Sequence, residues 1–390
     1  MIDSADLVIV GGGCIGCSTA FHAAKLDRSL KIILIERQHI AWGTTGRSTA
    51  IVRQHYSNPE TAGMALESLK VFENFPEAVG GDAGFTPTGY TLVVGSKDQE
   101  ALRRNVEMQR SLGIETSILE PGELKKLQPG VNIEGLAAAA YEPRSGYADP
   151  VATTQSFAKA AEELGVNILE QTKVLEILES GGKVRGVRTE KGEITAPRVL
   201  NAANVWANQI MPRKHSKLPI RALREQSCIF FKPQDFTTKL TVCGDFPNGF
   251  YFCPQGPDRL LTGSLESNLP ELEDPDNCEG VDYETVTIRS QKLVNRLPAM
   301  ARGRWERGWS GAYDVTPDWH PILDESSEVD GLYIAAGFSG HGFKLSPAVG
   351  KRMAQFVLSG NKPENLAPFS SSRFSQGKTL TGQYESNISA

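Results

Sequence analysis

Six residues near the start of the chain have the spacing of a dinucleotide-binding turn. Gly11-Gly12-Gly13-Cys14-Ile15-Gly16 matches G-x-G-x-x-G, follows the apolar run Leu7–Val10 and opens a stretch with helical periodicity. Gly11 permits the tight turn, Gly13 lets the backbone approach a pyrophosphate, and Gly16 lets the helix pack closely on the strand. The free N–H groups of the helix N-terminus attract the pyrophosphate. The motif therefore predicts a nucleotide cofactor, and a purely structural glycine turn is the alternative.

An acidic residue stands where such a motif needs a ribose ligand. Glu36 follows the second apolar run, Lys31–Ile35, 20 residues past Gly16. Its carboxylate can accept hydrogen bonds from both ribose hydroxyls and would repel a 2′-phosphate. We expect Glu36 and its neighbour Arg37 to contact the cofactor.

Two further segments favour a flavin over a nicotinamide. Thr44-Thr45-Gly46-Arg47-Ser48-Thr49 is small and polar, and Thr44, Thr45 and Ser48 could line phosphates and a ribityl chain, although an ordinary loop is the alternative. Near the C-terminus, Gly340-His341-Gly342-Phe343-Lys344 opens a long helix. A helix N-terminus there would stabilise the negative charge of a reduced flavin. Two such sites suit a long, two-ended cofactor; the rival is a nicotinamide with an anionic substrate.

The composition excludes several classes of protein. The 390 residues are 40% hydrophobic with a formal charge of −5, which is ordinary for a globular protein and lacks the electrostatic footprint of a nucleic-acid binder. No stretch reaches the ~20 apolar residues of a membrane span, and the N-terminus has no secretory signal. Cys14 and Cys17 form C-x-x-C, but a zinc site needs two more ligands, so we expect packing and no metal. Few cysteines and no signal predict a cytoplasmic protein.

The elements that position these residues follow an α/β pattern at both ends of the chain, and a different pattern separates the two parts. Strand Leu7–Val10, helix Cys17–Leu26 and strand Lys31–Ile35 predict the opening of a doubly wound parallel sheet. Between residues 219 and 316, short aromatic-rich strands alternate with turns around a helix at 285–297, which is typical of a mixed, largely antiparallel sheet. Strand Leu332–Ala336 and helix Lys344–Leu358 then restore the first pattern.

This alternation predicts two interleaved domains of a mixed α/β (α+β) fold. We expect a discontinuous Rossmann-like FAD-binding domain at 1–80, 145–215 and 325–375. A substrate-binding domain would occupy 81–144 and 216–324, and 376–390 would form a polar tail.

Five stretches in order resemble one family of flavoenzymes. They are Val8–Gly16, Gly46–Tyr56, Tyr141–Asp149, Arg307–Asp324 and Ala335–Gly350. The chain resembles the FAD-dependent amine oxidoreductases of the D-amino-acid oxidase superfamily, and most of all the branch of sarcosine oxidase and the β subunits of sarcosine oxidase and proline dehydrogenase. The resemblance implies hydride transfer from the carbon next to an amine to flavin N5, then hydrolysis of the imine. The implied substrate is a small secondary or N-methyl amino acid, with oxygen or another electron acceptor.

The resemblance also assigns roles to single residues. Arg53 and Lys344 match the arginine and lysine that clamp the substrate carboxylate over the flavin. Tyr251 and Tyr313 fall where the family has active-site tyrosines, although each could equally be a sheet aromatic. We also expect Val174, Trp206 and Gly311 to contact the cofactor.

Three positions depart from the family pattern. Gly311 replaces the cysteine that attaches the flavin in monomeric sarcosine oxidase, so we expect non-covalent FAD. Leu261 falls where that enzyme has a lysine near flavin N5, which weakens the case for a fast oxidase. Asn204 stands where the family usually has glycine, which could alter local cofactor contacts.

Several functions remain open at this point. The chain could be a glycine or D-amino-acid oxidase, or the β subunit of a hetero-oligomeric proline or sarcosine dehydrogenase with partner subunits. A non-catalytic assembly factor that holds FAD is a further alternative. The Arg53 and Lys344 pair argues against the last, because structural FAD needs no substrate clamp.

Overall fold

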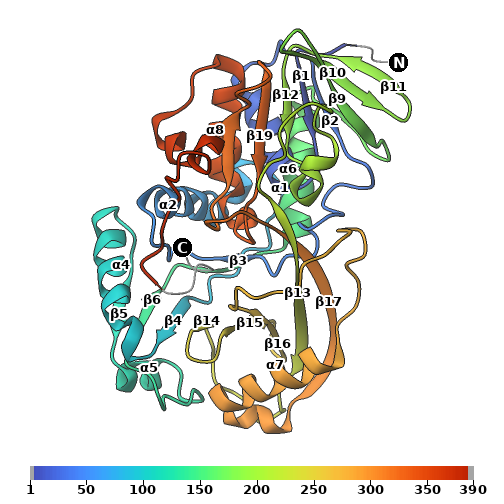
Figure 1. The fold of residues 1–390 in the computed structure, drawn as a ribbon. Coiled ribbons are helices and arrows are strands. Elements are labelled where there is room, and N and C mark those ends of the chain that lie inside the picture. Colours follow the sequence, from blue (N-terminus) through green and yellow to red (C-terminus); the bar gives the residue numbers. More distant parts are fainter. Residues whose placement is uncertain (1–3, 385–390) are drawn as a thin grey trace.

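The computed structural model describes residues 4–384, and within them two large sheets dominate (Figure 1). The first has six strands in the order β18-β19-β12-β1-β2-β8. Its neighbours are parallel except for the antiparallel pair β18 and β19. The strands are β1 (Leu7–Val10), β2 (Ile32–Ile35), β8 (Asn167–Leu169), β12 (Val199–Asn201), β18 (Ile322–Glu325) and β19 (Leu332–Ala336).

Both faces of this sheet are covered. Leu7 and Ile9 pack with α1 (Cys14–Leu26), α6 (Pro150–Glu163) and α8 (Gly342–Ser359) in one apolar cluster. Val8 and Val10 pack on the other side with a three-stranded sheet of β9 (Val174–Ser180), β10 (Lys183–Thr189) and β11 (Gly192–Thr195). A strand buried on both faces needs a continuous apolar sequence, which explains the LVIV of β1.

The second large sheet has eight strands in the order β17-β13-β16-β15-β14-β4-β6-β5. Its neighbours are antiparallel except for β14 and β4. Figure 1 shows β13 and β17 as long strands that run from the first sheet into the second. The strands are β4 (Tyr90–Val94), β5 (Ser117–Leu119), β6 (Ala138–Glu142), β13 (Arg221–Phe231), β14 (Val242–Asp245), β15 (Phe250–Gln255), β16 (Arg259–Ser264) and β17 (Arg304–Val315).

Helices and one small strand pair complete the chain. β3 (Ile51–Val52) pairs with β7 (Gly146–Tyr147). The remaining α-helices are α2 (Pro59–Glu73), α3 (Phe75–Ala78), α4 (Gln99–Ser111), α5 (Pro121–Leu127) and α7 (Tyr283–Arg296).

The predicted fold class is confirmed; the differences lie at element ends and in short elements that were not predicted. α1 begins at Cys14 instead of Cys17, because the second half of the glycine motif is itself the first helical turn. β6 and β14 were not predicted: β6 opens with three alanines, which carry no strand signal, and β14 is only four residues long. The predicted domain boundaries stay a prediction.

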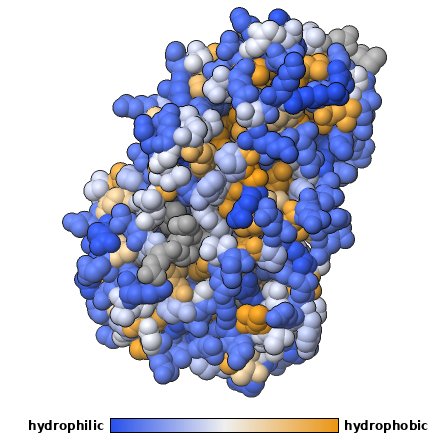
Figure 2. All heavy atoms as spheres, viewed as in Figure 1, coloured by the Kyte–Doolittle hydropathy of each residue, from blue (hydrophilic) through white to orange (hydrophobic). Residues whose placement is uncertain are grey.

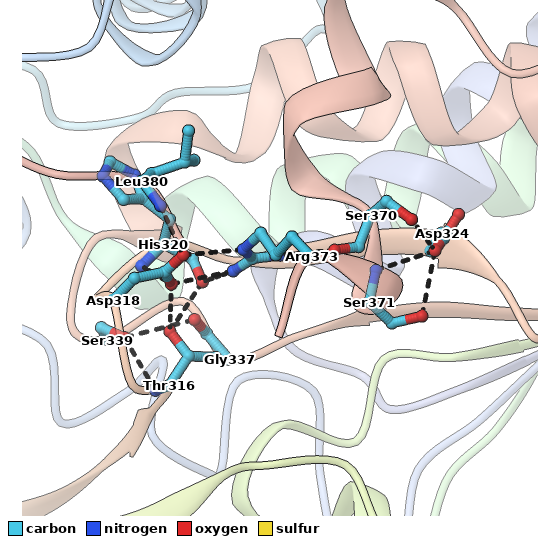
Figure 3. Close-up of polar contacts among 10 residues, drawn as sticks. All are labelled: Thr316, Asp318, His320, Asp324, Gly337, Ser339, Ser370, Ser371, Arg373 and Leu380. Carbon is cyan, nitrogen blue, oxygen red and sulfur yellow. Dashed lines mark hydrogen bonds and ion pairs between the residues drawn. The ribbon is translucent and has the colours of Figure 1, made fainter. Parts of the chain in front are cut away.

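The chain beyond α8 folds back on the protein (Figure 3). Arg373, which is 4% exposed, donates from Nε and Nη2 to the carboxylate of Asp318 at 2.7 and 2.9 Å. Within the stretch expected as a polar tail, the Leu380 N–H donates to Asp318 at 3.1 Å. The hydroxyl of Tyr384, 5% exposed, lies 2.7 Å from His55 Nε2. The described part of this stretch is therefore tied to the core.

The surface is largely polar on the face shown in Figure 2, with apolar side chains exposed mainly along its middle. Among the described helices, none has both the length and the apolar character that crossing a bilayer requires.

Candidate active site

A single cavity joins the nucleotide motif to the predicted substrate clamp. Every residue predicted for the site lines it except Gly16. Gly16 lies beneath the turn, where an added Cβ would stand 2.0 Å from the Gly11 carbonyl oxygen. That contact is the close approach of helix and strand that the motif requires. The fold thus brings residues from both ends of the chain to one place, while their individual roles stay predictions.

The glycine turn presents a helix N-terminus to the cavity. α1 begins after Gly13, which has no side chain to cap the helix, and the Cys14 N–H lies 3.2 Å from Thr45 Oγ1. Gly11 has φ +117°, and a Cβ there would lie 2.5 Å from the Ala202 carbonyl oxygen. A helix start that has no N-cap side chain and is lined by glycine and hydroxyl groups binds phosphate well.

Glu36 is held at the edge of the same cavity by backbone N–H groups. Its Oε2 accepts from Gly12 at 2.8 Å, and its Oε1 accepts from Gln38 at 2.8 Å. Next to it, the Arg37 guanidinium stacks over Trp206 at 4.0 Å and pairs with Asp276 at 2.5 Å. Asp276 comes from the region between β16 and α7, so that region also closes the nucleotide end.

A second helix N-terminus faces the cavity from α8. The loop before it is fixed by Asp314, whose Oδ2 accepts from the N–H groups of Gly337 and Phe338 at 2.6 and 3.0 Å. Burial raises the pKa of Asp314 to about 6. Gly340 has φ +83°, and a Cβ there would lie 2.8 Å from the Tyr313 ring. The glycine therefore lets the tyrosine lie directly on the loop.

Arg53 is positioned by a stretch from the middle of the chain. Glu142 Oε2 accepts from the Gln54 N–H at 2.9 Å and from the Ser145 hydroxyl at 2.6 Å. The guanidinium itself lies over the Tyr56 ring at 4.4 Å and donates to the His55 carbonyl. Arg53 is 8% exposed, so this cation is buried without a carboxylate partner in direct contact among the described residues.

Lys344 adds a second buried cation. It lies in the first turn of α8 and is 7% exposed. Burial, and then the charge of Arg53, hold the pKa of Lys344 well below its ordinary value. An anion bound between the two would offset the repulsion by Arg53 and stabilise the charged form of Lys344, so the pair is suited to a carboxylate.

Tyr251 and Tyr313 offer neutral hydroxyls. The Tyr251 hydroxyl donates to Thr49 Oγ1 at 3.2 Å, and its ring covers Gly263, where a Cβ would lie 2.2 Å from the hydroxyl oxygen. Burial raises the pKa of both tyrosines above the ordinary value. Both therefore serve as hydrogen-bonding groups at neutral pH.

The structure adds cavity residues that sequence patterns did not reveal. Glu225 and Ser227 lie on β13 and line the cavity, and so does Tyr90 of β4. Glu225 pairs directly with Gly311 across the strands. Strand alternation alone could have placed Glu225 and Ser227 on one face, but the partner strand and register were needed to show which face.

Of the three residues that depart from the family pattern, two line the cavity and one does not. Asn204 lines the cavity with φ +54°, a conformation that glycine adopts freely and asparagine tolerates. Gly311 also lines it, 3.3 Å from Arg47 Cβ if a Cβ were added. Leu261 is 3% exposed in an apolar cluster and is not part of the cavity wall.

These residues fit FAD. The cavity offers two helix starts, a ribose-type carboxylate and a hydroxyl-lined loop to one elongated ligand. Among residues 4–384, no three His, Cys, Asp or Glu side chains are grouped to hold a metal ion.

Comparison with known proteins also identifies an FAD-dependent enzyme. Residues 6–356 match the family model for FAD dependent oxidoreductase (DAO). FAD-dependent oxidoreductase domain-containing protein 1 from Bos taurus is 30% identical over 96% of this chain and 86% of its own. Sarcosine oxidase subunit beta from Arthrobacter sp is 28% identical over 97% and 93%. The chain spans only 42% of the related human mitochondrial sarcosine dehydrogenase.

One solved structure has the same fold over nearly the whole length of this chain. L-proline dehydrogenase from P. horikoshii superposes with a TM-score of 0.89 at 30% identity, over 97% of this chain and 100% of that one. The resemblance inferred from five sequence stretches is thereby confirmed, as are FAD as the cofactor and enzymatic function. The chain belongs to the DAO family of FAD-dependent oxidoreductases, flavin enzymes that act on the C–N bonds of amino acids.

Proposed function

We propose that this protein oxidises the C–N bond of a small secondary or N-methyl amino acid. The observation that carries the proposal is the pair of buried cations, Arg53 and Lys344, in the cavity that also holds the dinucleotide motif. Buried cations without a carboxylate are unfavourable unless a ligand supplies one. An amino acid carboxylate is such a ligand.

Bound FAD supplies the chemistry by accepting a hydride. The protein supplies position. The fork of Arg53 and the point charge of Lys344 would fix the carboxylate and thereby the carbon next to the amine. Tyr251 and Tyr313 would add neutral hydrogen-bonding groups. Water then hydrolyses the imine product.

The relatives support the substrate class. Their names include sarcosine, an N-methyl amino acid, and L-proline, a cyclic secondary one. Glycine oxidase from Geobacillus kaustophilus shares the fold with a TM-score of 0.81 at 24% identity. A primary amino acid therefore remains the alternative substrate.

The test is anaerobic reduction of the flavin by a panel of amines: sarcosine, dimethylglycine, L- and D-proline, glycine and D-alanine. We expect sarcosine or a proline to bleach the flavin absorbance, and glycine and D-alanine to do so far more slowly. Admitting oxygen then separates an oxidase, which recolours at once, from a dehydrogenase. If no amine in the panel reduces the flavin, the proposal fails.

A second proposal concerns assembly. Sarcosine oxidase subunit beta is named as one subunit of a larger enzyme. Leu261, which the resemblance aligns with the lysine of a fast oxidase, lies outside the cavity wall and supplies no cation to it. We propose that the chain works with partner subunits and passes electrons to an acceptor other than oxygen. Slow recolouring in air, with fast turnover on an artificial dye, would support this.

Two finer points are also proposals. Gly311 offers no sulfur, which supports FAD held without a covalent bond at that position. The six cysteines all lie buried and free, which supports a reducing compartment such as the cytoplasm.

A further inference from the structure

Glu225 is a buried carboxylate, and one of its two oxygens has no hydrogen-bond partner among the described residues. It is 3% exposed and lines the cavity from the middle of β13. Its Oε1 accepts from the Ser264 N–H at 2.6 Å. Its Oε2 is buried and has no hydrogen-bond partner. A buried acceptor without a partner is costly, so its presence calls for a ligand that is not in the protein itself.

The other carboxylates of the cavity wall are already occupied. Glu36 accepts from two backbone N–H groups, and Asp314 holds the loop before α8 in the same way. Glu225 is therefore the acidic side chain of the described cavity wall with a free acceptor.

The register of β13 and β17 places Glu225 among the predicted substrate and flavin contacts. Opposite residues of an antiparallel pair point to the same face. Glu225 is opposite Gly311, and Tyr313 is two residues from Gly311 on the same strand, so the side chains of Glu225 and Tyr313 point to the same face, and both line the cavity. Glu225 also acts electrostatically on both Tyr251 and Tyr313.

We propose that Glu225 binds the cationic amine of the substrate and accepts its proton, while Arg53 and Lys344 hold the carboxylate. This inference rests on the proposed function, because an amino acid reaches the site as a zwitterion. The cavity offers two cations for the carboxylate of the zwitterion and, for its ammonium group, one carboxylate oxygen that has no hydrogen-bond partner within residues 4–384.

The proposed transfer of a proton from the substrate ammonium group to Glu225 needs no further reactant. The N–H bond of the substrate ammonium breaks, the proton moves to Glu225 Oε2, and the electron pair stays on nitrogen. The substrate becomes a neutral amine and Glu225 a neutral carboxylic acid. Only the neutral amine has the lone pair that assists departure of a hydride from the adjacent carbon.

The surroundings suit a group that changes protonation near neutral pH. Burial raises the pKa of Glu225 to about 7, against the opposing charge of Arg289 on α7. Arg289 Nη2 lies 4.0 Å from Oε1, too far for a hydrogen bond. The other titratable groups coupled to Glu225 are Tyr251, Tyr313 and Cys228, which stay neutral, and Glu266, whose charge raises the pKa of Glu225 further.

The test measures binding instead of turnover. The holoenzyme is reduced with dithionite, so that it cannot oxidise sarcosine. Anaerobic calorimetry then gives dissociation constants for sarcosine and for (methylthio)acetate, which has the carboxylate but no amine. In Glu225→Gln, we expect at least tenfold weaker binding of sarcosine and a change below twofold for (methylthio)acetate. The glutamine retains an acceptor for Ser264.

The pH dependence gives the second readout. In the native protein, sarcosine affinity should rise as pH passes through about 7, because Glu225 must be ionised to accept the proton. Glu225→Gln should abolish this rise. Arg289→Met removes the neighbouring cation, so it should shift the midpoint to higher pH without abolishing the rise. Glu306→Gln is the matched control, because Glu306 on β17 also pairs with an arginine, at 2.8 Å, but lies outside the cavity wall.

The outcomes separate the two proposals. If (methylthio)acetate binds but Glu225→Gln weakens both ligands equally or neither, the role of Glu225 is wrong and the carboxylate clamp survives. If neither ligand binds the native protein and no amine of the panel reduces the flavin, the proposed function fails and this inference fails with it.

Discussion

Replacing Lys344 by methionine should separate substrate binding from stability. Methionine has similar length and fills the same buried space, but it carries no charge. Because burial and Arg53 already disfavour the charged lysine, its removal should not lower the unfolding temperature at pH 7. The loss of the positive charge should weaken only the binding of ligands that carry a carboxylate.

The magnitude follows from the lost interaction. A hydrogen bond to a charged group contributes about 1.5–3 kcal/mol, which corresponds to a ~10- to 150-fold weaker dissociation constant for (methylthio)acetate. The pH behaviour has a definite sign. The pKa of Lys344 is lowered in the free protein, and a bound carboxylate raises it again. Between these two pKa values, binding therefore takes up as much as one proton.

The assay is calorimetric titration in two buffers of different ionisation enthalpy. Native protein should take up more protons on binding than Lys344→Met. Lys351→Met is the matched control on the same helix, where the side chain is about half exposed and pairs with Glu67 at 2.8 Å. Binding by Lys344→Met within twofold of native protein would refute the reasoning.

Three further predictions test the cofactor site and its support. Gly16→Ala should purify without flavin, since its Cβ would stand 2.0 Å from a backbone oxygen, whereas Gly63→Ala, with nothing within 4 Å, should keep full flavin content. Arg373→Met should destabilise the protein by ~3–5 kcal/mol in chemical unfolding, because it leaves a buried aspartate unpaired. Arg302→Met, which breaks an exposed pair, should cost at most about 1 kcal/mol. Acid precipitation should release all flavin into the supernatant, since Gly311 cannot form a thioether; flavin retained in the pellet would contradict this.

The nucleotide end of the site was predictable because its signals are local. The glycine spacing, the apolar strands and Glu36 all lie within 30 residues, so they form one strand–turn–helix–strand unit that can be recognised from consecutive sequence. The α8 loop was predictable for the same reason. Local chemistry of this kind does not depend on knowing which strands pair.

The substrate end could not be predicted as well, because it depends on long-range register. Glu225 and Gly311 are far apart in sequence, and only the pairing of β13 with β17 shows that they share a face. The ion pair between Arg373 and Asp318 was also not predicted, because the C-terminal stretch could be described from the sequence only as polar. Charged residues are normally solvated, and composition alone does not reveal a buried pair.

The interleaved order of the six-stranded sheet has a consequence for synthesis in the cell. β1 and β2 leave the ribosome first, but their sheet is completed by β19, about 300 residues later, and its covering helix α8 follows. At ~5–20 residues per second, that gap lasts about 15–60 s. During this time the sheet lacks β19 beside β12, and α1 lacks its contact with α8, so the second helix N-terminus of the cofactor site is in place only when translation is nearly finished.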